Sequence, residues 1–295
     1  MASFDIYNAV TERIIRQLEA GCIPWEKPWT GVQSGAVSGA TGKPYSLLNQ
    51  MLLSRPGAYF TFNQIQKMGG TVRKGEKSSM IVFWKQIPIK EENPATGQNT
   101  ERLIPMLKYY NVFHVSQCDG IPPDVSVIED HGPETDQAAD SIISEYLNRS
   151  GVKLEYQKGD KAFYSPSTDR VVLPLREQFQ DMAEYYSTAF HELTHSTGHS
   201  SRLNRLTGKA FFGNEEYSKE ELTAEIGAAA LLNHCGIETG RSFRNSAAYI
   251  QSWLKVLRND KRMIVTASGA ASKAFDCITT ATPKEIYIWE ASYFI

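Results

Sequence analysis

The segment His191-Glu192-Leu193-Thr194-His195 constrains the fold more than any other stretch of the chain. Two histidines four positions apart lie about 40° apart around a helix axis, so both side chains project from one helical face. A tetrahedral Zn²⁺ can take two imidazole ligands at this spacing, and Glu192 is placed to deprotonate a metal-bound water. The segment therefore predicts a metal-binding helix, with Zn²⁺ as the expected ion and Mn²⁺ as the alternative.

This HExxH pattern is typical of zinc metallopeptidases and makes Glu192 the candidate general base. The preceding residues 176–190 lack glycine and proline and place apolar residues at helical spacing. Gly198 then provides a helix stop shortly after His195. We therefore expect one helix from about residue 176 through the motif.

A second helix is expected over residues 217–232, where Glu221 and Glu225 stand four positions apart. It resembles the glutamate-zincin (thermolysin-like) arrangement, which implies Glu221 as the third metal ligand and Glu225 as the acid that orients a ligand histidine. Glu225 remains the competing ligand, and a solvated acidic face is the other interpretation of the pair. Tyr217, one turn before Glu221, is a candidate to support an oxyanion.

A three-histidine metal site of the metzincin type is excluded by spacing. Gly198 fits that longer pattern, but the position of its third histidine is Ser201. His199 comes too early for that role and is expected on a loop or at the surface.

Charge divides the chain into two parts, although the net charge is only −2. Residues 1–90 carry 11 Lys+Arg against 5 Asp+Glu, a net +6, so the remainder carries −8. No run of eighteen apolar residues and no secretion signal is recognisable, and the four cysteines form no C-x-x-C pair. These features predict a cytoplasmic protein that does not span a membrane.

The basic part also contains aromatic residues, a combination that suits binding of single-stranded nucleic acid. The candidate DNA contacts are Trp25, Lys27, Trp29, Arg73, Lys74 and Lys77. The alternative is that the tryptophans belong to the core and the positive charge only aids solubility. A near P-loop in this region has Glu76 where the phosphate-binding lysine would stand, so we expect no nucleotide site.

The pattern of segments predicts an α+β protein with two domains, residues 1–120 and 135–295, joined by an acidic, proline-containing linker at 121–134. The expected N-terminal elements are helices at 3–20 and 45–53 and strands at 58–62, 80–84 and 107–115, with a loop or hairpin tip at 88–101. The expected C-terminal elements outside the metal-site helices are helices at 135–148, 247–258 and 267–279 and strands at 152–157, 162–165 and 169–173. The strand segment 171–173 is expected to offer an edge to an extended peptide.

Several motifs in order resemble the ArdC-type antirestriction proteins of conjugative plasmids. They are Pro24-Trp-Glu-Lys-Pro-Trp29, Thr61-Phe-Asn-Gln64, Val72-Arg-Lys-Gly-Glu-Lys-Ser78, Phe190-His-Glu-Leu-Thr-His-Ser-Thr-Gly-His199 and Glu220-Glu-Leu-Thr-Ala-Glu-Ile-Gly-Ala-Ala230. The resemblance implies an N-terminal α/β domain that binds single-stranded DNA, followed by a zincin-like metallopeptidase domain. It also implies protection of incoming conjugative DNA from host restriction, with a component of the host restriction system as the candidate protein substrate.

Two alternatives to this function stay open at the sequence level. One is a DNA-independent cytoplasmic metalloprotease, and the other is a DNA-binding protein whose metal site is structural and not catalytic. A closed site with four protein ligands favours the structural role, whereas an open water position favours catalysis.

Overall fold

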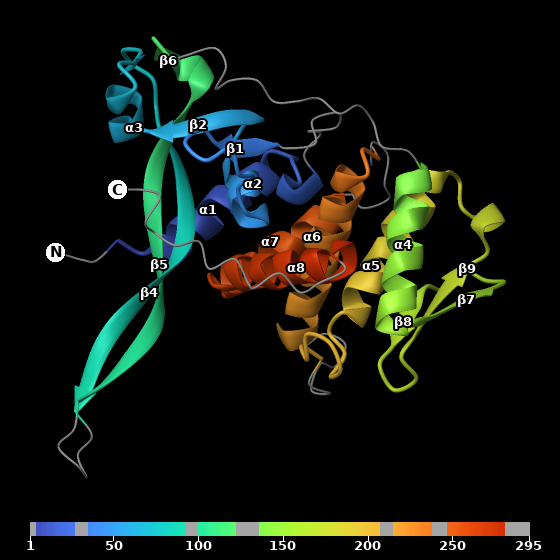
Figure 1. Ribbon diagram of the computed structural model, residues 1–295. Helices are drawn as coiled ribbons and strands as arrows, with labels where there is room; N and C mark the ends of the chain where they lie inside the picture. The colour runs from blue at the N-terminus through green and yellow to red at the C-terminus, as the bar shows by residue number, and fades with distance from the viewer. Residues whose placement is uncertain are drawn as a thin grey trace.

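The computed structural model combines helices and strands in an N-terminal and a C-terminal half, in agreement with the α+β prediction (Figure 1). The described residues are 4–26, 35–92, 99–121, 136–206, 215–237 and 247–280. Among them, no helix combines the length and apolar character needed to cross a bilayer. The expected linker at 121–134 lies almost wholly outside this part of the chain, so its boundaries stay a prediction.

The N-terminal half is built on a four-stranded sheet in the order β1–β2–β5–β4. Its strands are β1 (Ala36–Ser38), β2 (Gly57–Thr61), β4 (Ser79–Glu92) and β5 (Asn99–His114). β1 runs parallel to β2, whereas the other pairs are antiparallel. The β4–β5 hairpin continues far beyond the rest of the sheet and projects from the molecule as a two-stranded arm (Figure 1).

The arm corrects the expectation of a loop at 88–101. β4 continues to Glu92 and β5 begins at Asn99, so only residues 93–98 between them lie outside the described part. Pro88 and the polar residues after it suggested a turn. β4 is an edge strand, however, and an edge strand accepts a proline where its N–H would point to solvent.

Helices and short strands complete the N-terminal half. They are α1 (Ile6–Glu19), α2 (Leu47–Leu52), α3 (Phe62–Lys67), β3 (Thr71–Val72) and β6 (Cys118–Asp119), the last two forming a small antiparallel sheet. α1 begins where Asp5 accepts a hydrogen bond from the Asn8 N–H, and it buries Val10, Ile14 and Leu18 along one face. This face directs α1 toward the core between the two halves.

The C-terminal half places helices around a three-stranded sheet in the order β7–β9–β8. Its elements are α4 (Asp136–Ser150), β7 (Lys153–Gln157), β8 (Phe163–Ser165), β9 (Arg170–Pro174), α5 (Met182–Ser196), α6 (Glu215–His234), α7 (Ala247–Asn259) and α8 (Met263–Thr279). β9 contains residues 171–173 and is paired on both sides, so the expectation of a free peptide-binding edge there is wrong. Among the described residues, both outer strands of this sheet, β7 and β8, have an unpaired edge.

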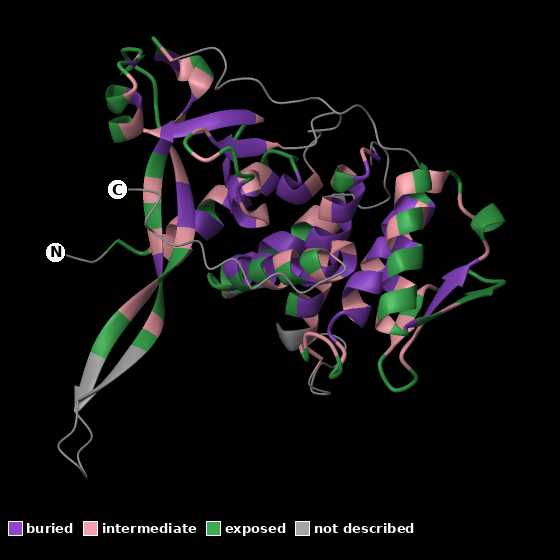
Figure 2. Ribbon diagram, viewed as in Figure 1, coloured by how far each residue is buried: buried purple, intermediate pink, exposed green. Residues whose placement is uncertain are grey.

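A single apolar cluster joins the two halves. Val10, Ile14 and Leu52 from the N-terminal half share it with Leu222 and Leu257 from the C-terminal half. Within it α1 contacts α7 and α2 contacts α8, and the buried residues form a continuous band through the centre of the molecule (Figure 2). A second cluster, between α4, β9, α5, α6 and α8, supports the helix that carries the two histidines.

Candidate metal centre

Helix α5 presents the histidines because its two ends are fixed locally. Asp181 caps its start by accepting a hydrogen bond from the Glu184 N–H at 2.8 Å, so the helix begins at Met182 and not near residue 176 as expected. At the other end the chain turns at Gly198, where a Cβ would stand 2.8 Å from the Leu206 Cγ. Leu193 faces the core and is 1% exposed, which leaves the two histidines on the opposite side.

Helix α6 can reach α5 because a glycine stands at their contact. A Cβ on Gly227 would lie 2.7 Å from Thr194 Cγ2 and 2.8 Å from its Oγ1, closer than real Cβ atoms come. The absence of a side chain at Gly227 therefore sets the separation of the two helices. This close approach brings Glu221, on the preceding turns of α6, to the histidine face of α5.

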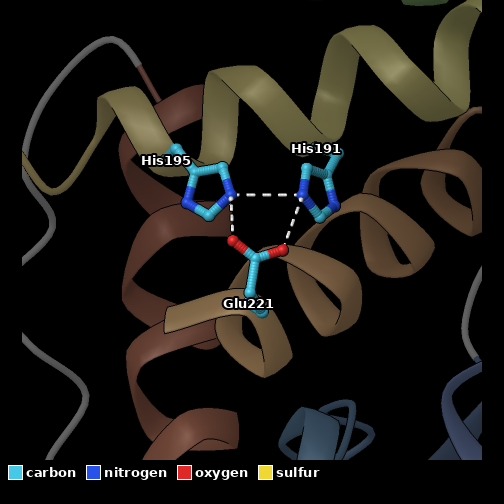
Figure 3. A group of neighbouring side chains, drawn as sticks. All are labelled: His191, His195 and Glu221. Atoms are coloured by element: carbon cyan, nitrogen blue, oxygen red, sulfur yellow. Dashed lines mark hydrogen bonds and ion pairs between the residues drawn. The ribbon is translucent and has the colours of Figure 1, made fainter. Parts of the chain in front are cut away.

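The donor atoms of His191, His195 and Glu221 converge on one point (Figure 3). The two histidine Nε2 atoms are 3.1 Å apart, and the Glu221 carboxylate oxygens lie 3.6 Å from His191 Nε2 and 3.5 Å from His195 Nε2. Ligands on a tetrahedral Zn²⁺ at about 2.0–2.1 Å from the ion stand about 3.3–3.4 Å from one another. The spacing and the donor types fit a divalent metal, and they place the three predicted ligand residues together.

A buried acid that the sequence analysis did not single out orients His195. Glu220 Oε1 lies 3.1 Å from His195 Nδ1, which leaves Nε2 free to face the converging point. Arg205 holds Glu220 in turn, with its Nε 2.7 Å from Oε2 and one terminal nitrogen 2.8 Å from Oε1. Burial raises the pKa of the Glu220 carboxyl, but Arg205 and His195 outweigh it and hold that pKa below its usual range. The adjacent acids Glu220 and Glu221 gave the only sequence signal for this arrangement.

Glu225 stands behind His191 and not at the converging point. Its Oε1 is 3.4 Å from His191 Nδ1, the ring nitrogen that faces away from Glu221. A carboxylate in this place can align the ring and increase the basicity of Nε2. The geometry therefore favours Glu221 for the ligand role and Glu225 for the orienting role.

The candidate base Glu192 is 8% exposed and lies beside the converging donors. Its charge raises the pKa of both His195 and Tyr217, so its carboxylate lies near both side chains. Tyr217 is also hydrogen-bonded to Glu221, and burial together with the Glu221 charge raises the pKa of its hydroxyl to about 12. The hydroxyl therefore keeps its proton and can donate a hydrogen bond next to the metal position.

The structure changes the set of candidate DNA contacts. Trp25 is 4% exposed and packs edge-on against Trp253 of α7, with ring centroids 6.2 Å apart. Its ring cannot stack on a base without leaving the core between the two halves, so Trp25 was wrongly assigned to the DNA surface. Lys27 and Trp29 lie outside the described residues.

Arg73, Lys74 and Lys77 lie on the loop between β3 and β4, and all three are exposed. Arg73 is already engaged by acids, at 3.2 Å from Asp119 and 3.8 Å from Glu76. Lys74 and Lys77 remain accessible cations on this loop. The three stay candidate phosphate contacts.

Two stretches of the chain match known families. Residues 4–113 match the N-terminal domain of anti-restriction factor ArdC, and residues 141–270 match a zincin-like metallopeptidase. The fold and the converging donors thus define an ArdC-type N-terminal region joined to a zincin-like region.

Solved structures agree over the full length. The metal-free crystal structure of the antirestriction ArdC protein from plasmid R388 is 37% identical with a TM-score of 0.71, covering 93% of this chain and 97% of that one. The Mn(II)-bound structure is 35% identical with a TM-score of 0.72, covering 95% and 100%. The chain belongs to the ArdC antirestriction family.

Curated relatives contain a similar sequence in proteins of two different lengths. Two Escherichia coli proteins named DNA primase TraC are 34% and 35% identical over 95% of this chain, which spans only 20% and 27% of their lengths. Protein y4eC of Sinorhizobium fredii (strain NBRC 101917 / NGR234) is 32% identical, with 92% of this chain and 91% of that protein covered. The whole chain is therefore similar both to a segment of larger proteins and to nearly all of a protein of comparable length.

Proposed function

We propose that this chain is an antirestriction protein that binds single-stranded DNA, protects incoming conjugative DNA from host restriction and carries a zinc-metallopeptidase-type site. The observation that carries this proposal is the similarity to ArdC of R388 across both halves, at 37% identity. The half-buried triad His191, His195 and Glu221 supports the metal part of the proposal. An N-terminal half with net positive charge supports the DNA part.

The residues around the triad have separable roles in the proposed hydrolysis. A bound divalent metal would polarise a substrate carbonyl and lower the pKa of a water molecule. Glu192 would accept the proton of that water and pass it to the leaving amine. Tyr217, which keeps its proton, would donate a hydrogen bond to the carbonyl oxygen as charge develops on it.

Among the described residues, the cluster holds three protein ligands and no fourth. An open position of this kind is typical of catalytic sites, whereas structural zinc sites are closed by four protein ligands. Two imidazoles and one carboxylate suit Zn²⁺, and the Mn(II)-bound ArdC structure makes Mn²⁺ the second ion to test. Titration calorimetry with each ion alone measures which one this triad prefers.

The decisive variant is Glu192→Gln in the full chain, with Glu184→Gln as the matched control. Glu184 stands on the same helix α5 and is exposed. We expect Glu192→Gln to retain binding of single-stranded oligonucleotides and to lose cleavage of an unstructured protein such as casein. Transfer of unmodified plasmid DNA into a restricting host then measures whether protection depends on Glu192.

Each outcome selects one function. Loss of protection in Glu192→Gln alone would make hydrolysis part of the antirestriction role. Full protection by that variant would leave the metal site with a structural role. A wild-type chain that cleaves casein but binds no DNA would instead be a DNA-independent metalloprotease.

A further inference from the structure

The two outer edges of the β4–β5 arm are poorly suited to hydrogen bonding with an additional strand. The backbone N–H and C=O of Val82 both bond to the side-chain amide of Asn49 at 2.8 Å, so they point away from β5. In an antiparallel ladder this orientation repeats at every second residue. The backbone N–H and C=O groups of the even-numbered residues of β4, and of the β5 residues paired with them, therefore point outward. Pro88 on β4 and Pro105, opposite Gln86, fall at outward positions where each removes an N–H. The arm therefore presents side chains on its faces and not a template for strand addition.

One face of the arm carries a row of exposed aromatic rings. Trp84 pairs with Leu107 and Tyr109 with Val82, so Trp84 and Tyr109 are diagonal neighbours on the same face. Each is 41% exposed. Phe4, just before α1, is 57% exposed and lies against Tyr109 with ring centroids 4.9 Å apart. We name Phe4, Tyr109 and Trp84 the aromatic row.

A basic hollow lies on the same face of the sheet at the other end of α1. It has a volume of about 490 Å³ and is lined by Arg13, Arg16 and Gln17 of α1 and by Met80, two positions before Val82 on β4. Within the described part of the chain, no ion pair engages either arginine, and Arg16 bonds only a backbone carbonyl of its own helix. Two cations without a carboxylate partner leave a site for an anion.

The arm carries charges of both signs, with Glu91, Glu92 and Glu101 among the residues toward its tip. Lys85 and Lys108 lie on the face opposite the aromatic row, because Lys85 pairs with Met106 and Lys108 pairs with Phe83. The cations on the face of the aromatic row are Arg13 and Arg16 of the basic hollow. Exposed rings followed by cations without carboxylate partners are the chemistry that binds unpaired bases and phosphates. An apolar protein partner would not need the unpaired arginines, so the surface favours nucleic acid.

We propose that the aromatic row is the surface on which bases of single-stranded DNA stack, with Arg13 and Arg16 contacting the phosphates at its end. This assignment rests on the proposed function and gives the DNA a place in the structure. It moves the principal base contacts from the turn around Trp25 to the arm. Lys74 and Lys77, on the loop between β3 and β4, lie at the opposite end of β4 from the arm tip and are not needed for stacking.

The test measures binding of fluorescein-labelled oligothymidine to the full-length protein by fluorescence anisotropy. Trp84→Ala and Tyr109→Ala should each weaken binding by roughly 5- to 150-fold, the range for loss of one base–aromatic stack. Trp84→Phe, which keeps a ring, should retain most of the affinity. Met106→Ala is the matched control because Met106 is 40% exposed on the opposite face of the same arm, and it should bind as the wild type does.

A salt series tests the basic hollow separately. Arg13→Ala should reduce the slope of log affinity against log salt by about 0.7, the value for one phosphate contact with a single strand. The midpoint of thermal unfolding is measured for each variant. A midpoint equal to that of the wild type shows that a change in DNA binding is not caused by a loss of folding.

Three outcomes would overturn the assignment. Wild-type binding with unchanged affinity in Trp84→Ala and Tyr109→Ala would leave the proposed function standing and remove the aromatic row from it. An equal loss in Met106→Ala would show that the arm acts without a preferred face. Dimerisation of the wild type that Trp84→Ala abolishes, without effect on DNA binding, would assign the row to a second copy of the chain. No binding by the wild type at all would instead remove the proposed function.

Discussion

The metal centre and the β4–β5 arm place their functional side chains in opposite environments. At the centre, Glu192, Glu220 and Glu225 are each less than 10% exposed, and Glu220 and Glu225 each lie against a ligand histidine. On the arm, Leu103 and Trp84 are 60% and 41% exposed, and the backbone edges are blocked. Burying a polar group without a partner costs free energy, so each buried polar side chain of such a centre needs a hydrogen-bond or charge partner. Exposed side chains on the arm do not need such partners, because water solvates them. The arm only has to prevent its backbone edges from pairing with strands of other molecules.

A leucine-to-alanine substitution should change the free energy of unfolding by very different amounts in the two regions. Leu193→Ala removes a side chain that is 1% exposed on the core-facing side of the histidine helix and should lower the free energy of unfolding by about 2–5 kcal/mol. Leu103→Ala on the arm should change it by less than about 0.5 kcal/mol, because little apolar surface is lost from the interior. Chemical denaturation measures both. A large cost for Leu103→Ala would show that the arm packs against something in solution.

Two arginine–aspartate pairs allow a second comparison. Arg202 is 8% exposed and bonds to Asp169, whereas Arg73 and Asp119 are 44% and 64% exposed. Asp169→Asn leaves a buried guanidinium without its charge partner and should cost about 3 kcal/mol, and asparagine tolerates the positive φ of 47° at this position. Asp119→Asn should cost about 0–1 kcal/mol. Equal costs in the two variants would contradict the distinction.

The pair of Arg202 and the half-buried Asp169 also predicts a pH dependence of stability. The hydrogen bond from Arg202 holds the pKa of the Asp169 carboxyl below its usual range, against the opposing effect of burial, and Tyr164 also bonds it. A group whose pKa is lowered by folding stabilises the native state above its unfolded pKa of about 3.9 and loses that contribution as pH falls through the folded value. The difference in stability between wild type and Asp169→Asn should therefore shrink below about pH 4. A constant difference down to pH 2 would exclude the charge as its source.

The orienting acid of the metal centre gives an intermediate effect. Glu220→Gln keeps the shape of the side chain but removes the charge that aligns His195 and pairs with Arg205. Metal affinity should fall by about 10–100-fold, the usual effect of losing an outer partner of a ligand histidine. Calorimetric titration with Zn²⁺ measures it, and Glu184→Gln on the exposed side of α5 should bind as the wild type does. Unchanged affinity would mean that Glu220 serves only Arg205.

The smallest effect concerns two helical glycines. Alanine normally stabilises a helix relative to glycine by about 0.5–1 kcal/mol, and Gly269→Ala should do so because nothing lies within 4 Å of its added Cβ. Gly227→Ala should instead lower stability by about 1 kcal/mol, because the Cβ would overlap Thr194 and push α6 from α5. Thermal unfolding gives the sign of each change. Stabilisation by Gly227→Ala would show that the helices can separate without cost.

The metal-site helix was predictable because its pattern is local. The spacing of His191 and His195 specifies a helical face, and the acids four apart on the next helix identify Glu221 among few alternatives. Glu220 and Arg205 were missed because their pairing depends on a turn after Gly198 that no local pattern encodes. Trp25 was misplaced for a similar reason: the ring that packs edge-on against it, Trp253, lies on α7, more than 220 positions later. The arm was shortened in the prediction because Pro88 reads as a strand breaker unless the strand is known to be an edge.

The cluster that joins α1 and α2 to α6, α7 and α8 has a consequence for how this sequence can be divided. The two family matches, 4–113 and 141–270, look like separable units along the chain. Cut between them, each piece would expose the apolar surface that Leu52 and Leu257 now bury in common, and a patch of that kind promotes aggregation. We therefore expect both halves together to form the unit that folds independently. In agreement, the TraC primases match the chain over 95% of its length.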